Sequence, residues 1–295
     1  MIKALIDPNG APTFSASVNG VAVYLDNFAM KCLAKGDADL RKRFLTACQT
    51  GTELLFSITN AVEIVGPQGA SSAAIRALLN EVGPHWYPLE MDLNTVLDRE
   101  SKGYEPGKCC FSDQLLIAYF KSRTSEDVPG SGRVIDLSEN FFKLGLFIDF
   151  LLQRREWFEQ KRAEMDDVLL QGIKKCRIKA KTNRQWLDYA IPSRRFDGRS
   201  PATSAHNNLI RNFITDRGDQ LKKGDGIDFY HAVMASAYAN FAALDKHWKR
   251  RIANLPKPNS LARIYYEPEL ALMIADVESG LLQLKSLKQP TAILS

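Results

Sequence analysis

The 295-residue sequence has little cysteine and histidine and no long apolar run, and each shortage excludes a class of protein. Its five cysteines show no CxxC spacing and have no histidine at zinc-ligand distance, so we expect reduced thiols that bind no metal. No two of the four histidines lie four residues apart, which argues against a histidine metal cage. No stretch approaches the roughly 20 apolar residues of a membrane span, and the N-terminal sequence lacks a signal-peptide pattern. We therefore expect a cytoplasmic protein.

Common catalytic signatures are also absent. The chain contains no GxGxxG, GxxxxGK[ST], GxSxG or HExxH sequence, which argues against dinucleotide-binding, P-loop, α/β-hydrolase and zincin functions. Its composition, with 45% hydrophobic and 25% charged residues, is that of a folded protein. A chain of this length buries about three quarters of its unfolded surface, so it needs no disulfide or structural metal to hold a core.

Positive charge is concentrated between residues 172 and 223. This stretch has 13 Lys and Arg against four Asp, a local net charge of +9, whereas the whole chain carries +5 and the remainder therefore −4. Trp186, Tyr189 and Phe196 are interleaved with the cations, a combination that suits nucleic acid because cations neutralise phosphates and aromatic rings stack on bases. A solvated insertion is the alternative. The candidate nucleic-acid contacts are Lys174, Lys175, Arg177, Lys179, Lys181, Arg184, Arg194 and Arg195.

Two parts of the sequence, residues 1–87 and 224–268, alternate strand and helix patterns. Val21–Leu25 and residues 52–58 are apolar runs predicted as buried strands, and shorter strands are predicted at 241–244 and 262–266. Helices are predicted over residues 27–35, 38–48, 71–82 and 227–240, and Asn60 is expected to open another. This alternation is typical of a parallel sheet with crossover helices.

Residues 88–223 have a mainly helical pattern and are interpreted as an insertion. Helices are predicted at 112–122 and, capped by Asp136, from 137 to about 176, with a Pro-Gly-Ser-Gly loop at 129–132 between them. Residues 269–295 are predicted as an amphipathic helix and tail. The predicted fold is thus α/β, a parallel-sheet core split by a long, mainly helical, basic insertion.

Four carboxylates are expected at one edge of this sheet. Asp26 follows the first strand, and Glu63 lies early in the helix after the second. Asp228 opens the helix that leads into the strand ended by Asp245. That helix descends roughly 15 Å and the strand climbs back roughly 16 Å, so Asp228 and Asp245 should lie level with each other. This carboxyl edge is where α/β proteins place their sites.

Converging carboxylates repel one another unless a divalent cation is bound, and their hard oxygens suit Mg²⁺ or Mn²⁺. Such a site can lower the pKa of a bound water and stabilise the oxygens of a phosphodiester. We therefore predict metal-assisted phosphodiester hydrolysis, with Ser57, Asp225 and His231 as candidates to support the acids. Each acid also has a structural alternative. Asn60–Glu63 and Asp225–Asp228 match a capping box, and Asp26 and Asp245 suit strand-ending turns.

Three segments carrying these residues resemble the PIN domain, a family of metal-dependent ribonucleases. They are VYLDNFAMKCLA with Asp26, SITNAVEIVG with Ser57 and Glu63, and DGIDFYHAVMASAYANFAALDKHW with Asp228, His231 and Asp245. Two departures are Ala243, where the family often has a hydroxyl residue, and Asn240, where an Asp is common. A third is the insertion between the second and third acids, which is longer than in compact PIN toxins.

The resemblance implies a Mg²⁺- or Mn²⁺-dependent endoribonuclease in which Asp26, Glu63, Asp228 and Asp245 are catalytic metal ligands. RNA, preferably single-stranded, is the expected partner, with DNA as the alternative, and a toxin–antitoxin or defence role fits the family. Two rivals remain at this point. One is a structure-specific flap-type DNA nuclease. The other is a catalytically inactive PIN-like interaction module, whose C-terminal helix docks a second copy or an inhibitory protein.

Overall fold

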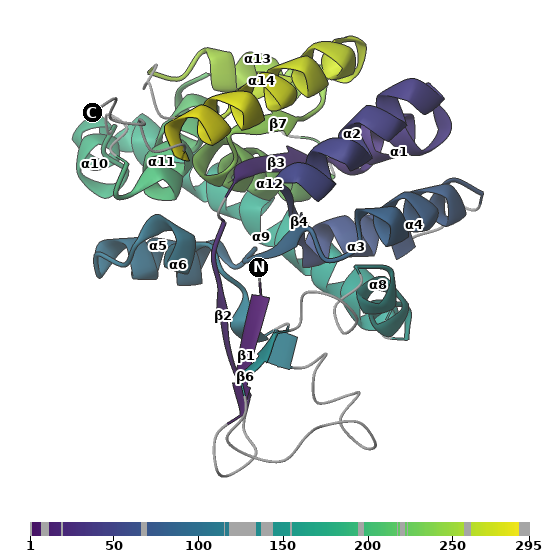
Figure 1. Cartoon of the computed structure of the whole chain (residues 1–295). Helices are drawn as coiled ribbons and strands as arrows, with labels where there is room; N and C mark the ends of the chain where they lie inside the picture. Colours follow the sequence, from purple (N-terminus) through teal and green to yellow (C-terminus); the bar gives the residue numbers. More distant parts are fainter. Residues whose placement is uncertain are drawn as a thin grey trace, which may run out of the picture.

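A five-stranded, all-parallel sheet with the strand order β5-β4-β3-β7-β8 forms the centre of the computed structural model. Three of its strands, β3, β4 and β7, are labelled in Figure 1. The strands are β3 (Val21–Leu25), β4 (Thr52–Ser57), β5 (Trp86–Leu89), β7 (Phe241–Ala243) and β8 (Arg263–Tyr265). The structure describes residues 2–6, 12–18, 20–65, 70–114, 116–117, 134–136, 144–153, 155–193, 198–216, 218, 222, 224–256 and 261–288. The fold is α/β, as the sequence predicts.

The strand order contains one reversal of direction. The chain moves outward from β3 through β4 to β5, and then returns to the opposite side of β3 with β7 and β8. Tyr24 of β3 pairs with Leu55 of β4 on one side and with Ala242 of β7 on the other. In doubly wound sheets the crevice at such a reversal, beyond the carboxyl ends of the strands, is where ligands bind. Here that position lies between β3 and β7.

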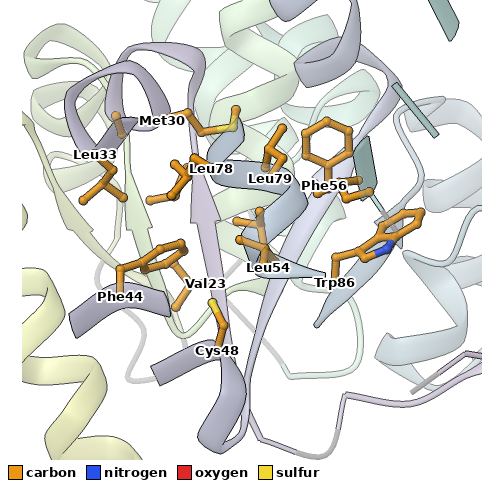
Figure 2. Packing of buried hydrophobic residues seen from close by; sticks show 14 of the residues in the cluster. Val23, Met30, Leu33, Phe44, Cys48, Leu54, Phe56, Leu78, Leu79 and Trp86 are labelled. Atoms are coloured by element: carbon orange, nitrogen blue, oxygen red, sulfur yellow. The ribbon is translucent and has the colours of Figure 1, made fainter. Parts of the chain in front are cut away.

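Both faces of the central strand β3 are buried, which explains why its sequence is a continuous apolar run. Side chains alternate between the faces. Figure 2 shows one face, where Val23, Leu54 and Phe56 pack with Trp86 and with Met30 of a covering helix. Tyr24 and Leu55 lie on the other face.

Helices cover each face. The Val23 face packs against α1 (Asn27–Lys35), α2 (Ala38–Thr50), α3 (Ile58–Val65), α4 (Ala70–Val82), α8 (Leu144–Leu152) and α14 (Leu270–Lys288). The Tyr24 face packs against α5 (Leu93–Ser101), α9 (Arg155–Thr182), α10 (Arg184–Ala190), α11 (Pro201–Thr215), α12 (Asp225–Tyr238) and α13 (Lys246–Ala253). Two short elements, α6 (Pro106–Cys109) and η1 (Glu267–Glu269), complete the described helices.

The helices of residues 88–223 complete the core of the sheet on both faces. Phe147 of α8 belongs to the apolar cluster of Val23. Leu169 of α9 and Leu209 of α11 belong to the cluster of Tyr24. The predicted insertion is therefore packed into the same two cores as the sheet.

Some local predictions were wrong. Strand β5 lies where a helical stretch was expected to begin. The prediction missed it because Pro88 interrupts the strand pattern, although a proline is tolerated in a strand at the edge of a sheet. Asp136 ends an unpredicted strand: β6 (Val134–Asp136) pairs with β1 (Ile2–Ile6), which also pairs with β2 (Pro12–Ala16). The start of the helix that Asp136 was predicted to cap lies outside the described residues. Helix α9 begins at Arg155 and continues past Cys176. The loop at 129–132 and most of the helix predicted at 112–122 lie outside the described residues.

None of the helices in the described part of the chain is long and apolar enough to cross a membrane. The most apolar of them, α8, has only nine residues.

Candidate functional site

The four predicted acids line one pocket at the carboxyl edge of the sheet, where β3 and β7 end. The pocket has a volume of about 200 Å³. Its lining residues, called here the acidic pocket, are Asp26, Asn27, Phe28, Glu63, Asp228, His231, Leu244, Asp245 and Trp248. Four separate segments of the chain thus contribute carboxylates to one cavity.

Asp26 and Asp245 are positioned by the ends of two neighbouring strands. The backbone N–H of Asp26 donates to the carbonyl of Ala243 at 3.0 Å, which holds the ends of β3 and β7 together. Asp26 Oδ1 caps α1 by accepting from the Ala29 amide at 2.7 Å. Asp245 Oδ1 caps α13 by accepting from the amides of His247 and Trp248 at 2.7 and 2.9 Å. Each cap uses Oδ1, and a carboxylate has a second oxygen that can accept from or bind a ligand.

Glu63 reaches the pocket from α3, which begins two residues earlier than predicted. Because the helix starts at Ile58, Asn60 lies inside it and does not cap it. The Asn60 side chain instead accepts from the Ser57 amide at 3.0 Å and donates to the Leu25 carbonyl at 3.1 Å. Ser57 is buried in this network and does not line the pocket. Ser57 and Asn60 therefore join the end of β4 to the end of β3. Glu63 lies beyond the first turn of α3, so it is not part of a capping box.

Asp228 is positioned by a residue that the sequence analysis missed. Helix α12 starts after Gly224, whose φ of 98° is left-handed. The amides of Gly224 and Gly226 donate to the buried carboxylate of Asp166 on α9, at 2.9 and 2.8 Å. Asp225 accepts from the Lys222 amide at 2.7 Å and does not line the pocket. No local sequence pattern marks Asp166, because only the packing of α9 on α12 distinguishes it from the other charged residues of α9.

His231 lies on the same side of α12 as Asp228 and is fully enclosed. The Tyr24 hydroxyl hydrogen-bonds to His231 Nδ1. The Nε2 atom lies 3.9 Å from Glu63 Oε2 and has no hydrogen-bond partner within the described structure. Burial lowers the pKa of His231 to about 3, so the imidazole is neutral at physiological pH.

The carboxylates of the pocket repel one another. The pKa of Asp26 is raised from 3.8 to about 7, mainly by burial and also by the nearby carboxylates of Asp245 and Asp228, against the lowering effect of the Ala29 amide. Negative charge is therefore costly here unless a cation compensates it.

A hard divalent cation matches this donor set in chemistry, since carboxylate oxygens are the ligands that Mg²⁺ and Mn²⁺ prefer. Across the residues that the structure describes, no three His, Cys, Asp or Glu side chains are already arranged to hold an ion. The four acids share one pocket without forming a ready-made ion site.

The predicted nucleic-acid residues lie elsewhere. Arg177 donates to the carbonyls of Phe213 and Asp216, at 2.7 and 3.2 Å, and so ties α9 to the end of α11. Lys179 lies over the Trp186 ring, 5.5 Å from its centroid. Exposed positions are Lys174, Lys175, Lys181 and Arg184, whereas Arg194 and Arg195 lie outside the described residues. None of the described ones lines the acidic pocket.

No family model, curated protein or solved structure matches this chain. The support for a function is therefore the site itself, a pocket of four carboxylates at the point where the strand order reverses.

Proposed function

We propose that this protein is a Mg²⁺- or Mn²⁺-dependent endonuclease that hydrolyses RNA, of the PIN-like type that its sequence resembles. One observation carries the proposal: Asp26, Glu63, Asp228 and Asp245 come from four segments and line one pocket at the reversal point of the sheet. Nucleases that use divalent cations need such a group of oxygen ligands beside the phosphate.

Helix capping explains only part of this arrangement. It accounts for the Oδ1 atoms of Asp26 and Asp245. It does not account for Glu63, which lies past the first turn of α3, or for Asp228, since α12 is capped through Asp166. Two carboxylates thus line the pocket from positions where capping does not require them, which favours a ligand site over an inactive module.

A bound Mg²⁺ or Mn²⁺ would supply a water of lowered pKa and positive charge next to the phosphate. The four acids would hold it, and the caps on Asp26 and Asp245 keep those two side chains in place. The neutral His231 is held by Tyr24 and lies next to Glu63, so it adds no positive charge that would compete with the cation.

Two buried ring nitrogens add to the polar character of the pocket. His231 Nε2 and Trp248 Nε1 lack hydrogen-bond partners among the described residues, and both residues line the pocket. The Trp248 ring N–H can only donate, and an unsatisfied buried donor costs about 1–3 kcal/mol, so a ligand or water that accepts from it is favoured. Phosphate oxygens and ordered water both meet that requirement.

The test is cleavage of a mixed-sequence single-stranded RNA by the full chain with Mn²⁺ or Mg²⁺. Asp228→Asn should reduce the rate by at least about 100-fold, the usual cost of losing a group that stabilises developing charge, and Asp26→Asn should do the same. Asp225→Asn is the matched control, since Asp225 is on the same helix turn outside the pocket, and it should stay within about twofold of the native rate.

Cleavage that needs no metal, or equal activity in Asp228→Asn and Asp225→Asn, would contradict the proposal. A flap DNA substrate is tested in parallel. If the chain cleaves the flap and leaves RNA intact, the acidic pocket is still the site, but the substrate is DNA.

A further inference from the structure

A second depression adjoins the acidic pocket and shares one wall with it. Phe28, two residues after Asp26, is 40% exposed and lines both. The second depression, called here the α1 groove, has a volume of about 560 Å³ and lies between α1 and the segment where η1 leads into α14. The residues that line it include Phe28, Lys31, Cys32, Lys35, Glu267 and Leu270.

Helix α1 presents an aromatic ring and two cations along this groove. Phe28, Lys31 and Lys35 are spaced three and seven residues apart, which places them on one face of the helix over about 10 Å. Both lysines are exposed. Lys35 Nζ donates to the Ser71 hydroxyl at 2.7 Å, and an ammonium group has two further N–H donors.

The wall of the groove opposite α1 is unsuited to a phosphate. It contains the buried Leu270 and the exposed Glu267, whose carboxylate accepts from Cys32 Sγ at 3.5 Å. A carboxylate repels a phosphate but accepts hydrogen bonds from the amino groups of a base. This wall therefore suits an uncharged planar base, while phosphates would lie along the lysines of α1.

Further cations lie between the acidic pocket and η1. Lys246 follows Asp245 directly and lies over the Tyr266 ring, 5.9 Å from its centroid, and Tyr266 immediately precedes η1. Lys249 lies over the same ring at 5.0 Å and is paired with Glu269. Cations thus occur on the α13 side of the site as well as along α1.

We propose that the α1 groove binds the nucleotide adjacent to the scissile bond of a single-stranded substrate, with its base stacked on Phe28 and its phosphates paired with Lys31 and Lys35. This rests on the proposed nuclease function, because Phe28 connects the groove to the acidic pocket. The described cations of the basic stretch line neither cavity, so the groove takes the role that the sequence analysis assigned to that stretch.

The experiment measures binding, so that it does not depend on catalysis. A fluorescein-labelled ten-nucleotide single-stranded RNA is titrated with the full chain in EDTA, and its anisotropy is followed at several salt concentrations. The double variant Lys31→Ala/Lys35→Ala should bind about tenfold more weakly, and the slope of log affinity against log salt should become shallower by about 1.4, or 0.7 for each phosphate that the variant no longer neutralises. The double variant Lys174→Ala/Lys175→Ala removes the same charge from α9 and should change neither quantity.

Phe28 is tested separately from the lysines. Phe28→Ala should weaken binding at least fivefold without changing the salt slope, because stacking on one base contributes about 1–3 kcal/mol and releases no counterion. Phe28→Tyr keeps the ring and should bind like the native chain.

Unchanged affinity in the Lys31/Lys35 and Phe28→Ala variants would overturn the inference, as would an equal loss in the Lys174/Lys175 control or no binding by the native chain at low salt. Failure of the nuclease function gives a different result, namely RNA bound in the groove but not cleaved when Mn²⁺ or Mg²⁺ is added.

Discussion

The acidic pocket and the basic stretch at residues 172–223 differ in how the positions of their charged residues in the sequence relate to their positions in the structure. The four acids extend from position 26 to position 245, with the longest gap between Glu63 and Asp228, yet they line one cavity. The cations are close together in the sequence, yet the helices distribute them over different surroundings. Arg211, for example, donates to the carbonyls of Leu187 and Ile191 and pairs with Asp188.

This difference shows that charged residues close together in the sequence need not share surroundings in this fold. Arg177 and Arg211 hold α9, α10 and α11 together through backbone carbonyls, which is a structural role. The acids were found because each follows or precedes a strand, and the edge of a parallel sheet brings such positions together. Position relative to the sheet thus predicted which acids share a pocket.

The largest effect on stability is expected where α9, the helix that carries the first cations of the basic stretch, contacts α12, the helix of Asp228. Asp166→Ala removes the carboxylate that caps α12 and leaves the buried amides of Gly224 and Gly226 without their acceptor. At about 1–3 kcal/mol for each donor, the free energy of unfolding should fall by about 3 kcal/mol, measured by urea denaturation. The neighbouring exposed Asp167→Ala should change it by less than about 0.5 kcal/mol. Equal effects in the two variants would show that α9 does not support the site helix.

A smaller effect, with a defined pH dependence, is expected inside the acidic pocket. The folded-state pKa of Asp26 is raised from 3.8 to about 7, so the folded protein binds this proton more tightly than the unfolded chain does. The contribution of Asp26 to stability is thus present below pH 4 and is lost as pH rises to about 7. In EDTA at pH 8, Asp26→Asn should be more stable than the native chain by about 2 kcal/mol, while it keeps the α1 cap.

The control for this prediction is the same pair of proteins at pH 4, where the native Asp26 is protonated and the difference should nearly vanish. His231 contributes with the opposite sign, because its lowered pKa of about 3 removes stability as pH falls below about 6.5, but it is present in both proteins. A stability difference that is the same at pH 4 and pH 8 would contradict the raised pKa of Asp26.

The smallest effect separates structural from exposed cations within the basic stretch. Arg177→Ala should lower the free energy of unfolding by about 1.5 kcal/mol, because it loses charge-assisted hydrogen bonds to two carbonyls at the end of α11. Lys175→Ala, two residues away on the exposed side of α9, should change it by less than about 0.5 kcal/mol. If thermal and urea unfolding show the same loss of stability for Arg177→Ala and Lys175→Ala, the distinction between structural and exposed cations is wrong.

Local sequence patterns were sufficient for the elements that carry the acids. The buried run Val21–Leu25, the helix Asn27–Lys35 and the strand that begins at Phe241 were all predicted near their observed positions. The reason is that a strand buried on both faces and a helix with one apolar face record their surroundings in their own residues. The expectation that Asp228 and Asp245 lie level followed from element lengths alone, and both residues line the same pocket.

Other features depended on partners that are distant in the chain. Strand β6 has only three residues and exists through its pairing with β1, about 130 residues earlier, and β5 contains a proline that a local pattern counts against a strand. Asp166 looks like any charged residue of α9 until α12 packs on it.

By itself, then, the sequence determined the α/β class, the helices and strands with clear periodicity, and the acids at the ends of those elements, because burial on a sheet or helix leaves a local pattern. The tertiary structure decided which charges meet. It placed Asp26, Glu63, Asp228 and Asp245 around one pocket, turned Arg177 inward to backbone carbonyls and set Phe28 between two cavities. Such contacts depend on strand order and helix packing between residues far apart in the chain, and no local pattern records them.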